Sequence, residues 1–406
     1  MKRKIFVWAQ IVVAAALFGL VTANILERLP KNEKRAKYIF LMIGDGMGST
    51  HVAATDSYLS YKQGKLGGEQ LLMTQLPYYG VATNHSADMH ATCSAAAATA
   101  IACGVKANNG TVGIDANGEY AKSIAFDLHE DGYNIGIITD VTLNQATPAG
   151  FYASSNSRGD HYEIAKQIAK SDLEFFAGSG FSALKGDGNM ESIDKYLEDN
   201  GYSVSWGEEE FMAESVGKDK VVLCQRKNRD KDAEDYMSFG RSADDMTLAR
   251  MLELGIEFNG TDDPFFIMCE GGTIDWSGHE NWTMAMIEDI LAFNEAIKVA
   301  YDFYLKHPEE TLIIVTADHE TGGISLGCDT LQWIDWAKLD KQWQESGKQV
   351  ILDSDQNKAL NSECGIGWTS MKHTGGPVPV YAIGKGAEKF MGRMDNTDIK
   401  GKILNR

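Results

Sequence analysis

Residues 37–48 read Lys37-Tyr-Ile-Phe-Leu-Met-Ile-Gly-Asp-Gly-Met-Gly48. The first half is apolar and rich in branched and aromatic side chains, which is typical of a strand buried on both faces of a sheet. The second half is a glycine-rich turn with one carboxylate, Asp45. A buried strand that runs into such a turn predicts one unit of a parallel α/β sheet, with Asp45 at the carboxyl end of the strand.

Three further apolar runs repeat this arrangement. Residues 134–139 run toward Thr147, residues 265–269 run into Glu270, and residues 311–316 run toward Asp318 and His319. Helix-like stretches follow the strands, so we predict a three-layer α/β fold with a mostly parallel central sheet and helices on both faces. In such sheets the ligand crevice lies outside the carboxyl ends of the strands, where we expect the active site.

The N-terminal segment differs in character from the rest of the chain, and two polar regions interrupt the predicted domain. Lys2, Arg3 and Lys4 precede an apolar run that ends in small residues at 21–23, which predicts a secretory signal peptide and an exported, periplasmic or secreted protein. An uncleaved signal would anchor the chain in a membrane. Residues 24–36 form a linker, and residues 37–398 are predicted as one catalytic domain with insertions near 181–245 and 327–370.

Charge and cysteine content restrict the partners and the cross-links. Lys and Arg number 38 against 57 Asp and Glu, so the net charge is −19, and removal of residues 1–23 makes it −22. This balance lacks the basic footprint of a nucleic-acid-binding protein. The even number of six cysteines permits disulfides in an exported chain, and Cys328 and Cys364, which share a polar region, are the pair we predict.

Individual motifs have ordinary explanations. Asp275 and His279 are four residues apart, a spacing that on a helix suits either a surface hydrogen bond or a shared metal. Ser94 begins an alanine-rich helix, where a serine is usually only an N-cap but where an anion would also be favoured. His373 lies in a glycine-flanked loop. The glycines of 44–48 have the wrong spacing for a dinucleotide fingerprint.

Taken in order, the motifs resemble those of the alkaline phosphatase family over residues 38–386. The matching segments are Ile43-Gly-Asp45-Gly-Met-Gly48, Ser94-Ala-Ala-Ala-Ala-Thr99-Ala, Cys103-Gly-Val-Lys-Ala-Asn-Asn-Gly-Thr-Val-Gly113, Ala146-Thr147-Pro148-Ala149 with Arg158, Glu270-Gly-Gly-Thr-Ile-Asp275 with His279, Thr316-Ala-Asp318-His319, and His373-Thr-Gly375.

The resemblance implies a metal-dependent phosphate monoester hydrolase, in which Ser94 becomes phosphorylated and Arg158 binds two phosphate oxygens. It implies two Zn²⁺ and one Mg²⁺, and a homodimer. One zinc would take Asp275, His279 and His373, and the second would take Asp45, Asp318 and His319; magnesium would take Asp45, Thr147 and Glu270. Imidazole-containing sites suit Zn²⁺ and all-oxygen sites suit Mg²⁺, which agrees with this division.

Three positions depart from the family pattern. The residue before the nucleophile is commonly an Asp that orients the arginine, but here it is Cys93, so Arg158 is either looser or held by another acid such as Asp88. Gln145 stands where the family often has Asp or His, which predicts weaker binding of Mg²⁺. Trp276 lies beside the expected zinc ligand Asp275.

Three other functions are alternatives to a phosphate monoester hydrolase. A sulfatase is disfavoured, because Cys93 is followed by Ser-Ala-Ala-Ala and not by the x-Pro-x-Arg that the modified residue of sulfatases needs. A phosphodiesterase or phosphotransferase of the same superfamily fits the fold equally well, since a fold does not fix a substrate. The third alternative is an exported protein that binds metal or phosphate without turnover.

Overall fold

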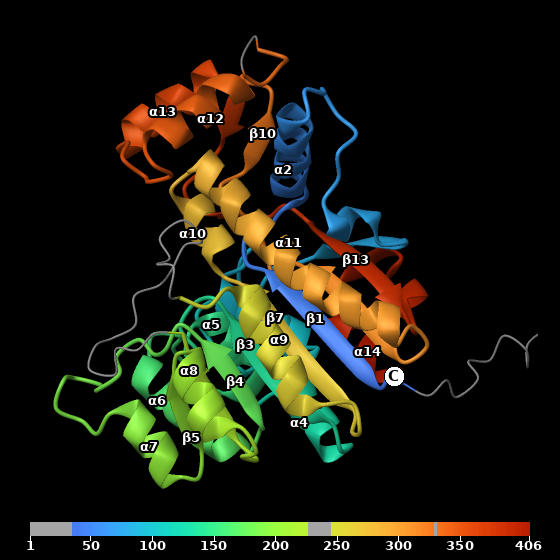
Figure 1. The fold of residues 1–406 in the computed structure, drawn as a ribbon, viewed down its shortest axis with the longest axis vertical. Helices are drawn as coiled ribbons and strands as arrows, with labels where there is room; N and C mark the ends of the chain where they lie inside the picture. Colours follow the sequence, from blue (N-terminus) through green and yellow to red (C-terminus); the bar gives the residue numbers. More distant parts are fainter. Residues whose placement is uncertain (1–34, 226–244, 329–330) are drawn as a thin grey trace, which may run out of the picture. The chain divides into compact units, whose positions relative to one another are not determined.

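Ten strands of the described residues form one sheet, and nine of them run in the same direction (Figure 1). The computed structural model describes residues 35–225, 245–328 and 331–406. Only β13 runs antiparallel to its neighbours in this sheet. The order is β14 (Gly392–Asp395), β2 (Tyr78–Thr83), β13 (Val378–Gly384), β8 (Thr311–Thr316), β1 (Tyr38–Gly44), β7 (Phe265–Gly271), β3 (Asn134–Thr139), β4 (Phe175–Gly178), β6 (Val221–Cys224) and β5 (Ser203–Trp206).

The four strands expected from the sequence are neighbours at the centre of this sheet. Residues of β1, β7 and β8 are all buried, as their continuous apolar runs require. The parallel register pairs Ile43 of β1 with Glu270 of β7 and with Thr316 of β8. The polar residues that follow these strands therefore leave the sheet at one edge, and the predicted α/β class is confirmed.

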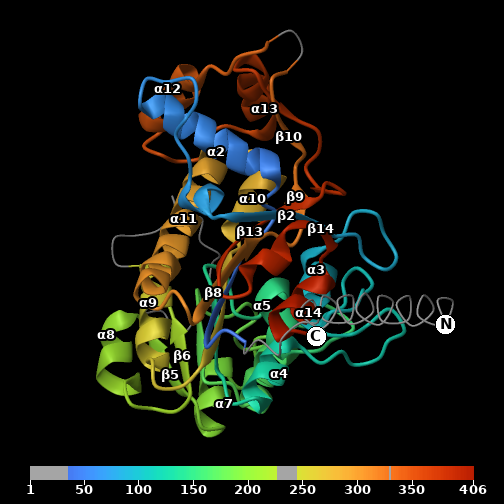
Figure 2. The ribbon, with the colours of Figure 1, turned by 90° about the vertical axis from the view of Figure 1, so that its right-hand side faces the viewer.

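Helices cover both faces of the sheet within the unit Ala36–Leu404 (Figure 2). One layer contains α9 (Leu248–Asn259) and α11 (Thr283–Lys306), and the opposite layer contains α3 (Ser94–Cys103), α4 (Ile124–Glu130), α5 (Ala146–Tyr152) and α14 (Asp398–Leu404). Other helices are α2 (Ser49–Lys62), α6 (His161–Ser171), α7 (Ile193–Asp199), α8 (Glu208–Glu210), α10 (Thr273–His279), α12 (Trp336–Glu345) and α13 (Ser354–Glu363). Within the described residues, no helix is long and apolar enough to span a membrane.

The alanine run of α3 serves packing. All ten residues of α3 are buried, and α3 packs closely on α5. A Cβ atom at Gly150 of α5 would lie 2.9 Å from the Cβ atom of Ala98, closer than two carbons approach in proteins. Small side chains on both helices therefore fix the position of α3, and with it the position of Ser94 at its first turn.

The two predicted insertions differ in their relation to the sheet. The first contributes β5 and β6, so part of it extends the sheet. The second contains α12, α13 and β11 (Ile366–Trp368), which pairs antiparallel with β10 (Ile324–Leu326) outside the main sheet. The predicted signal peptide and the predicted linker up to residue 34 lie outside the described residues.

The predicted disulfide between Cys328 and Cys364 is wrong, because all six cysteines are free thiols. Cys364 is buried in the hydrophobic core, and burial raises the pKa of its thiol to about 11. The sulfur of Cys328 instead lies 3.8 Å from the hydroxyl oxygen of Ser362. Two cysteines in one polar stretch of sequence are thus turned toward different surroundings.

Candidate active site

The ends of neighbouring strands bring the candidate residues to one edge of the sheet. Asp45 follows β1, Glu270 is the next-to-last residue of β7, and Asp318 and His319 follow β8. Because β13 is antiparallel, its first residues lie at the same edge as the last residues of β8, with Val380 paired to Thr316. His373, five residues before β13, therefore reaches this edge as well, on the short strand β12 (His373–Thr374), which pairs with β9 (Glu320–Thr321).

The turn after β1 lies directly against α10, which carries two of the candidates. Gly46 has a φ of +73°, and a Cβ atom there would lie 2.8 Å from the Cα atom of Asp275. A side chain at this position would push the turn away from the helix. The glycine therefore allows Asp45 and Asp275 to belong to one site.

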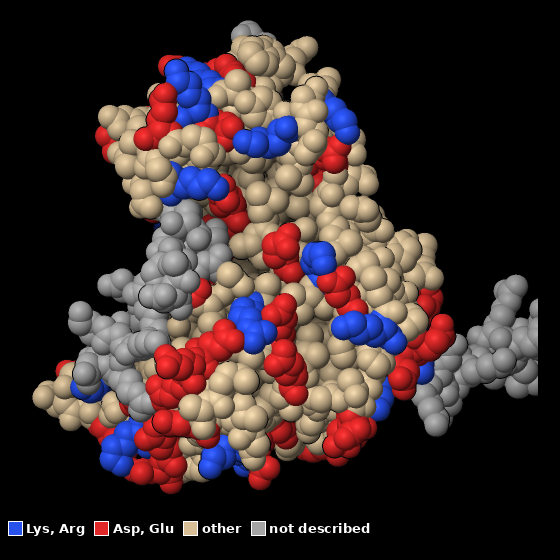
Figure 3. Space-filling model, in the orientation of Figure 1, with Lys and Arg blue, Asp and Glu red and all other residues tan. Residues whose placement is uncertain are grey.

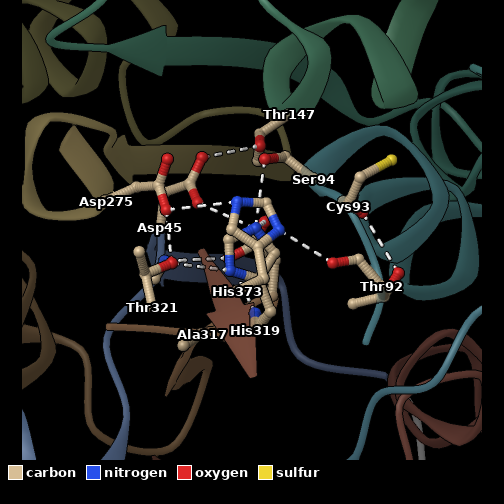
Figure 4. A network of polar contacts seen from close by, with 12 residues as sticks. Asp45, Thr92, Cys93, Ser94, Thr147, Asp275, Ala317, His319, Thr321 and His373 are labelled. Carbon is tan, nitrogen blue, oxygen red and sulfur yellow. Dashed lines mark hydrogen bonds and ion pairs between the residues drawn. The ribbon is translucent and has the colours of Figure 1, made fainter. Parts of the chain in front are cut away.

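Three oxygens surround one imidazole nitrogen in the first of two clusters (Figure 4). The Nε2 atom of His319 lies 3.3 Å from Asp45 Oδ1, 3.2 Å from Asp318 Oδ2 and 3.1 Å from Ser94 Oγ. Ligands at about 2.0–2.2 Å from a tetrahedral Zn²⁺ lie about 3.3 Å from each other. The two buried carboxylate oxygens have no hydrogen-bond donor among the described residues, so this cluster fits a cation.

The second cluster has two imidazoles and one carboxylate. The Nε2 atoms of His279 and His373 are 3.0 Å apart, and Asp275 lies 3.3 Å from the first and 3.5 Å from the second. His279 and Asp275 share one face of α10, as their spacing predicted. The Nδ1 atom of each histidine faces a backbone carbonyl, of Met371 and of Thr92, at 2.8 Å, so Nδ1 carries the proton and Nε2 is free to bind a metal.

Oxygen atoms alone gather on the other side of Asp45. Thr147 donates its hydroxyl to Asp45 Oδ2 over 3.3 Å, and Thr139 donates its hydroxyl to Glu270 Oε2 over 2.6 Å. All four residues are buried. A carboxylate pair with a hydroxyl and no imidazole is the kind of donor set that Mg²⁺ prefers.

Burial and mutual repulsion leave the carboxylates in need of a positive charge. Burial raises the pKa of Glu270 to about 8 and that of Asp318 to about 7. Burial and the charges of Asp318, Asp275 and Glu270 hold the pKa of Asp45 well above its usual range. Burial also acts on Asp275, but its contacts with His279 and the other nearby imidazoles outweigh burial and lower its pKa.

We predict a pH-dependent stability for the metal-free protein from these shifts. Glu270 and Asp318 bind protons more tightly in the folded than in the unfolded protein. Their folded pKa values exceed 4.5 and 3.8, the ordinary pKa values of a glutamate and an aspartate side chain. Between pH 4 and pH 8 the folded state therefore holds more protons, and the free energy of unfolding falls as the pH rises.

Thermal unfolding of chelator-treated protein between pH 5 and pH 9 measures this trend. The metal-loaded protein is the control, and metal at 1,000 times its Kd should add about 4 kcal/mol to the free energy of unfolding. A stability of the metal-free protein that rises steadily with pH over this range would contradict the prediction.

Ser94 is the first residue of α3, is 2% exposed and faces His319. Arg158 is partly exposed, and its positive charge helps to lower the pKa values of His319 and His373, although burial has the largest effect on both. The guanidinium forms no ion pair or hydrogen bond with any described residue. The expectation that Asp88 holds it is wrong, because Asp88 Oδ1 accepts from Asn109 N and Ser86 Oγ, each at 2.9 Å.

The three residues that depart from the family pattern lie close to the candidate site residues in the sequence. Cys93 is the N-cap residue of α3, and its sulfur points away from the imidazole rings (Figure 4). Gln145 is the N-cap residue of α5, and its side-chain amide binds no described residue. Trp276 is half-buried on α10 beside Asp275.

Sequence reasoning missed Thr321, which connects both clusters. Its hydroxyl donates to Asp275 Oδ1 and lies 3.2 Å from Nδ1 of His319. The residues at 319 and 321 share one side of an extended segment, so alternation along a strand could have indicated Thr321.

Comparison with known proteins assigns the family. The alkaline phosphatase family model matches residues 36–176 and 228–405, so the chain belongs to the alkaline phosphatase family, whose members are phosphatases. Alkaline phosphatase 4 of Bacillus subtilis is 30% identical over 91% of this chain and 88% of its own length. Streptomycin-6-phosphate phosphatase of Streptomyces griseus is 26% identical over 97% of this chain and 95% of its own length.

The fold is shared with solved members of the family. The alkaline phosphatase of the Antarctic bacterium TAB5 superposes with a TM-score of 0.75 and 29% identity, over 92% of this chain and 98% of that one. A histidine-to-glutamate variant of the TAB5 enzyme has been solved with Mg bound.

Proposed function

We propose that the chain hydrolyses phosphate monoesters through a phosphoserine formed on Ser94. The observation that carries the proposal is the contact between Ser94 Oγ and Nε2 of His319 at 3.1 Å, inside a buried group of carboxylates that needs cations. Ser94 Oγ attacks phosphorus, the bond from phosphorus to the ester oxygen breaks, and the alcohol leaves. Water then attacks the phosphoserine, which releases inorganic phosphate and restores the hydroxyl.

The side chains fit two zinc ions and one magnesium ion in the arrangement that the family resemblance implies. Asp275, His279 and His373 would hold the first zinc, Asp45, Asp318 and His319 the second, and Asp45, Thr147 and Glu270 the magnesium. When bound, these ions supply the Lewis-acid charge that makes the Ser94 alkoxide accessible and stabilises the attacking and leaving oxygens. The Mg-bound variant of the TAB5 enzyme supports a magnesium site in this fold.

Arg158 would bind two oxygens of the phosphoryl group with its guanidinium. A free guanidinium offers parallel N–H donors that match two phosphate oxygens, which an ammonium group does not. The chain's net charge of −19 works against attraction of a phosphate dianion from a distance. Acidic and basic side chains are interspersed on the face in Figure 3, which shows no continuous basic stripe. Capture of the substrate therefore depends on local charge at the site.

A substrate panel tests the proposed activity. Metal-loaded protein is assayed with an aryl phosphate, an aryl phosphodiester and an aryl sulfate, with and without chelator. We expect chelator-sensitive hydrolysis of the monoester, with slower or no hydrolysis of the others. Faster turnover of the diester would favour the phosphodiesterase alternative, and no turnover of any ester would leave only a binding protein.

Gln145 should limit the affinity for magnesium. Replacing it with Asp places a charge near the oxygen cluster, so Gln145→Asp should bind Mg²⁺ about 10–100-fold more tightly, the usual effect of a residue that supports metal ligands. Titration of Mg²⁺ into zinc-loaded protein measures this affinity. Gln145→Asn, which adds no charge, is the control, and equal affinity of the Asp variant and the native protein would refute the prediction.

The absence of a partner for Arg158 predicts an effect of Cys93→Asp. A carboxylate at this position would pair with the guanidinium and orient it, at about 1 kcal/mol for a hydrogen bond. KM for an aryl phosphate should therefore fall about fivefold. Cys93→Ser is the uncharged control. If KM stays unchanged in both variants, Arg158 is already well oriented.

The proposals for localisation and assembly rest on the N-terminal sequence and on the family resemblance. We propose export, on the basis of the charged and apolar segment at residues 1–23. A homodimer is the assembly that the family resemblance implies. Analytical ultracentrifugation of the purified chain measures it directly.

A further inference from the structure

The three residues before the nucleophile are held on two sides. On one side, Asn109 accepts the N–H of Cys93 with its Oδ1 atom at 2.8 Å and donates from Nδ2 to the carbonyl of Ala91 at 3.1 Å. On the other side, Nδ1 of His373 donates to the carbonyl of Thr92 at 2.8 Å. The side chain of Asn109 thus hydrogen-bonds to both ends of residues 91–93, and His373, a candidate zinc ligand, hydrogen-bonds to the middle residue.

This run determines where Ser94 lies. Cys93 is the N-cap residue of α3 in extended conformation, and no side chain caps the helix there. The bond from Asn109 to Cys93 N therefore fixes the peptide that enters the helix, one residue before the nucleophile. Nucleophilic attack needs the reacting atoms within about 3–3.5 Å and aligned, and a displacement of about 1 Å costs about 100-fold in rate.

The loop that contains Asn109 also contacts the backbone of Arg158, through the next residue, Gly110. The carbonyl of Gly110 accepts the N–H of Arg158 at 2.7 Å, and its own N–H donates to the sulfur of Cys93 at 3.1 Å. Val112 and Ser155 exchange two backbone hydrogen bonds of 2.9 Å, which continues the pairing of the two segments. A single residue, Gly110, thus connects the residue before the nucleophile with the backbone of Arg158.

Asp88 fixes the loop from the outside. Its carboxylate accepts the backbone N–H of Asn109 at 2.9 Å. Since the guanidinium of Arg158 has no partner among the described side chains, backbone pairing with this loop is what locates the arginine. The geometry therefore ties both predicted phosphate-contacting residues to Asn109 and Gly110.

We propose that Asn109 is a positioning residue that sets Ser94, and through Gly110 also Arg158, for attack on the bound phosphate ester. The proposal rests on the phosphoserine function argued above. The role requires one acceptor and one donor on the same short side chain. Aspartate keeps the acceptor for Cys93 N but turns a carboxylate oxygen toward the carbonyl of Ala91, and alanine keeps neither.

The test compares Asn109→Ala and Asn109→Asp with Asn108→Ala. The control residue is in the same loop, and its Nδ2 atom donates only to the carbonyl of Ala116 at 3.4 Å, away from the nucleophile. Rapid-quench measurements give the rate of phosphoserine formation from an aryl phosphate, and steady-state assays give KM. Bound zinc and Tm are measured on the same samples.

We expect Asn109→Ala to slow phosphoserine formation about 100-fold, with zinc content and Tm close to those of the native protein. Asn109→Asp, which keeps the hydrogen bond from Cys93 N, should form phosphoserine about tenfold more slowly than the native protein. Asn108→Ala should form it at the native rate. A rate of Asn109→Ala within threefold of native, an equal loss in Asn108→Ala, or a loss that only follows reduced zinc or Tm in both Asn109 variants would overturn the proposal. If the native protein forms no phosphoserine, the proposed function fails first and this role fails with it.

Discussion

Replacing Ser94 with alanine should reduce hydrolysis of an aryl phosphate by on the order of 10⁴-fold or more, as loss of a catalytic serine does in other hydrolases. The hydroxyl is the only part of the side chain that is lost, and the helix keeps an alanine-rich turn in which alanine is favourable. The fold should therefore be unaffected. Activity, Tm and bound metal are measured together.

The matched control for this variant is Ser49→Ala. Ser49 is exposed, lies close in sequence to Asp45 and begins α2. It should retain native activity. Residual activity of Ser94→Ala above about one-tenth of native would mean that another group or a water molecule attacks phosphorus, and the phosphoserine route would then be wrong.

Replacing Asp45 with asparagine should strongly reduce activity and at the same time stabilise the metal-free protein. Asp45 faces His319 with one oxygen and Thr147 with the other, so its charge serves two candidate ion sites. We expect a loss of about one equivalent of metal or more and of about 1,000-fold in activity.

The gain in stability follows from the raised pKa of Asp45. Ionising a carboxyl whose folded pKa is raised costs free energy, at about 1.4 kcal/mol for each pKa unit. Neutral asparagine avoids this cost, so at pH 8 metal-free Asp45→Asn should unfold at a higher temperature than the metal-free native protein.

Asp302→Asn is the control, because Asp302 pairs with Lys298 on the surface, where such pairs contribute little. Metal analysis and thermal unfolding give both readouts. Full metal content in Asp45→Asn, or a lower Tm of the metal-free variant, would contradict the role assigned to this carboxylate.

The sequence was sufficient for the centre of the fold. The buried runs that begin at 37, 134, 265 and 311 are the adjacent strands β1, β3, β7 and β8, because continuous apolar character and the polar turns that follow are local signals. Beyond the centre, pairing depends on contacts distant in sequence. The assignment of β5 and β6 to the sheet edge, the reversed direction of β13 and the orientation of two cysteines carry no local signal.

The candidate site was partly predictable for the same reason. Residues such as Asp45 and Asp318 directly follow strands, so their meeting at one edge follows from parallel topology. His373 reaches that edge only because β13 is antiparallel. Its assignment as a metal ligand came from the family resemblance and not from a local sequence signal. Asn109 acts through backbone groups of residues 91–93, and such contacts depend on loop conformation, which the sequence pattern does not specify.

The most direct test of the central claim is to trap the phosphorylated enzyme. Metal-loaded protein is mixed with an aryl phosphate, quenched within milliseconds in acid and digested, and the modified peptide is located by mass spectrometry. The account predicts one phosphate on the peptide that contains Ser94, formed no more slowly than kcat, and none in Ser94→Ala. Turnover of the ester with no phosphorylated peptide, or with the phosphate on another residue, would contradict it.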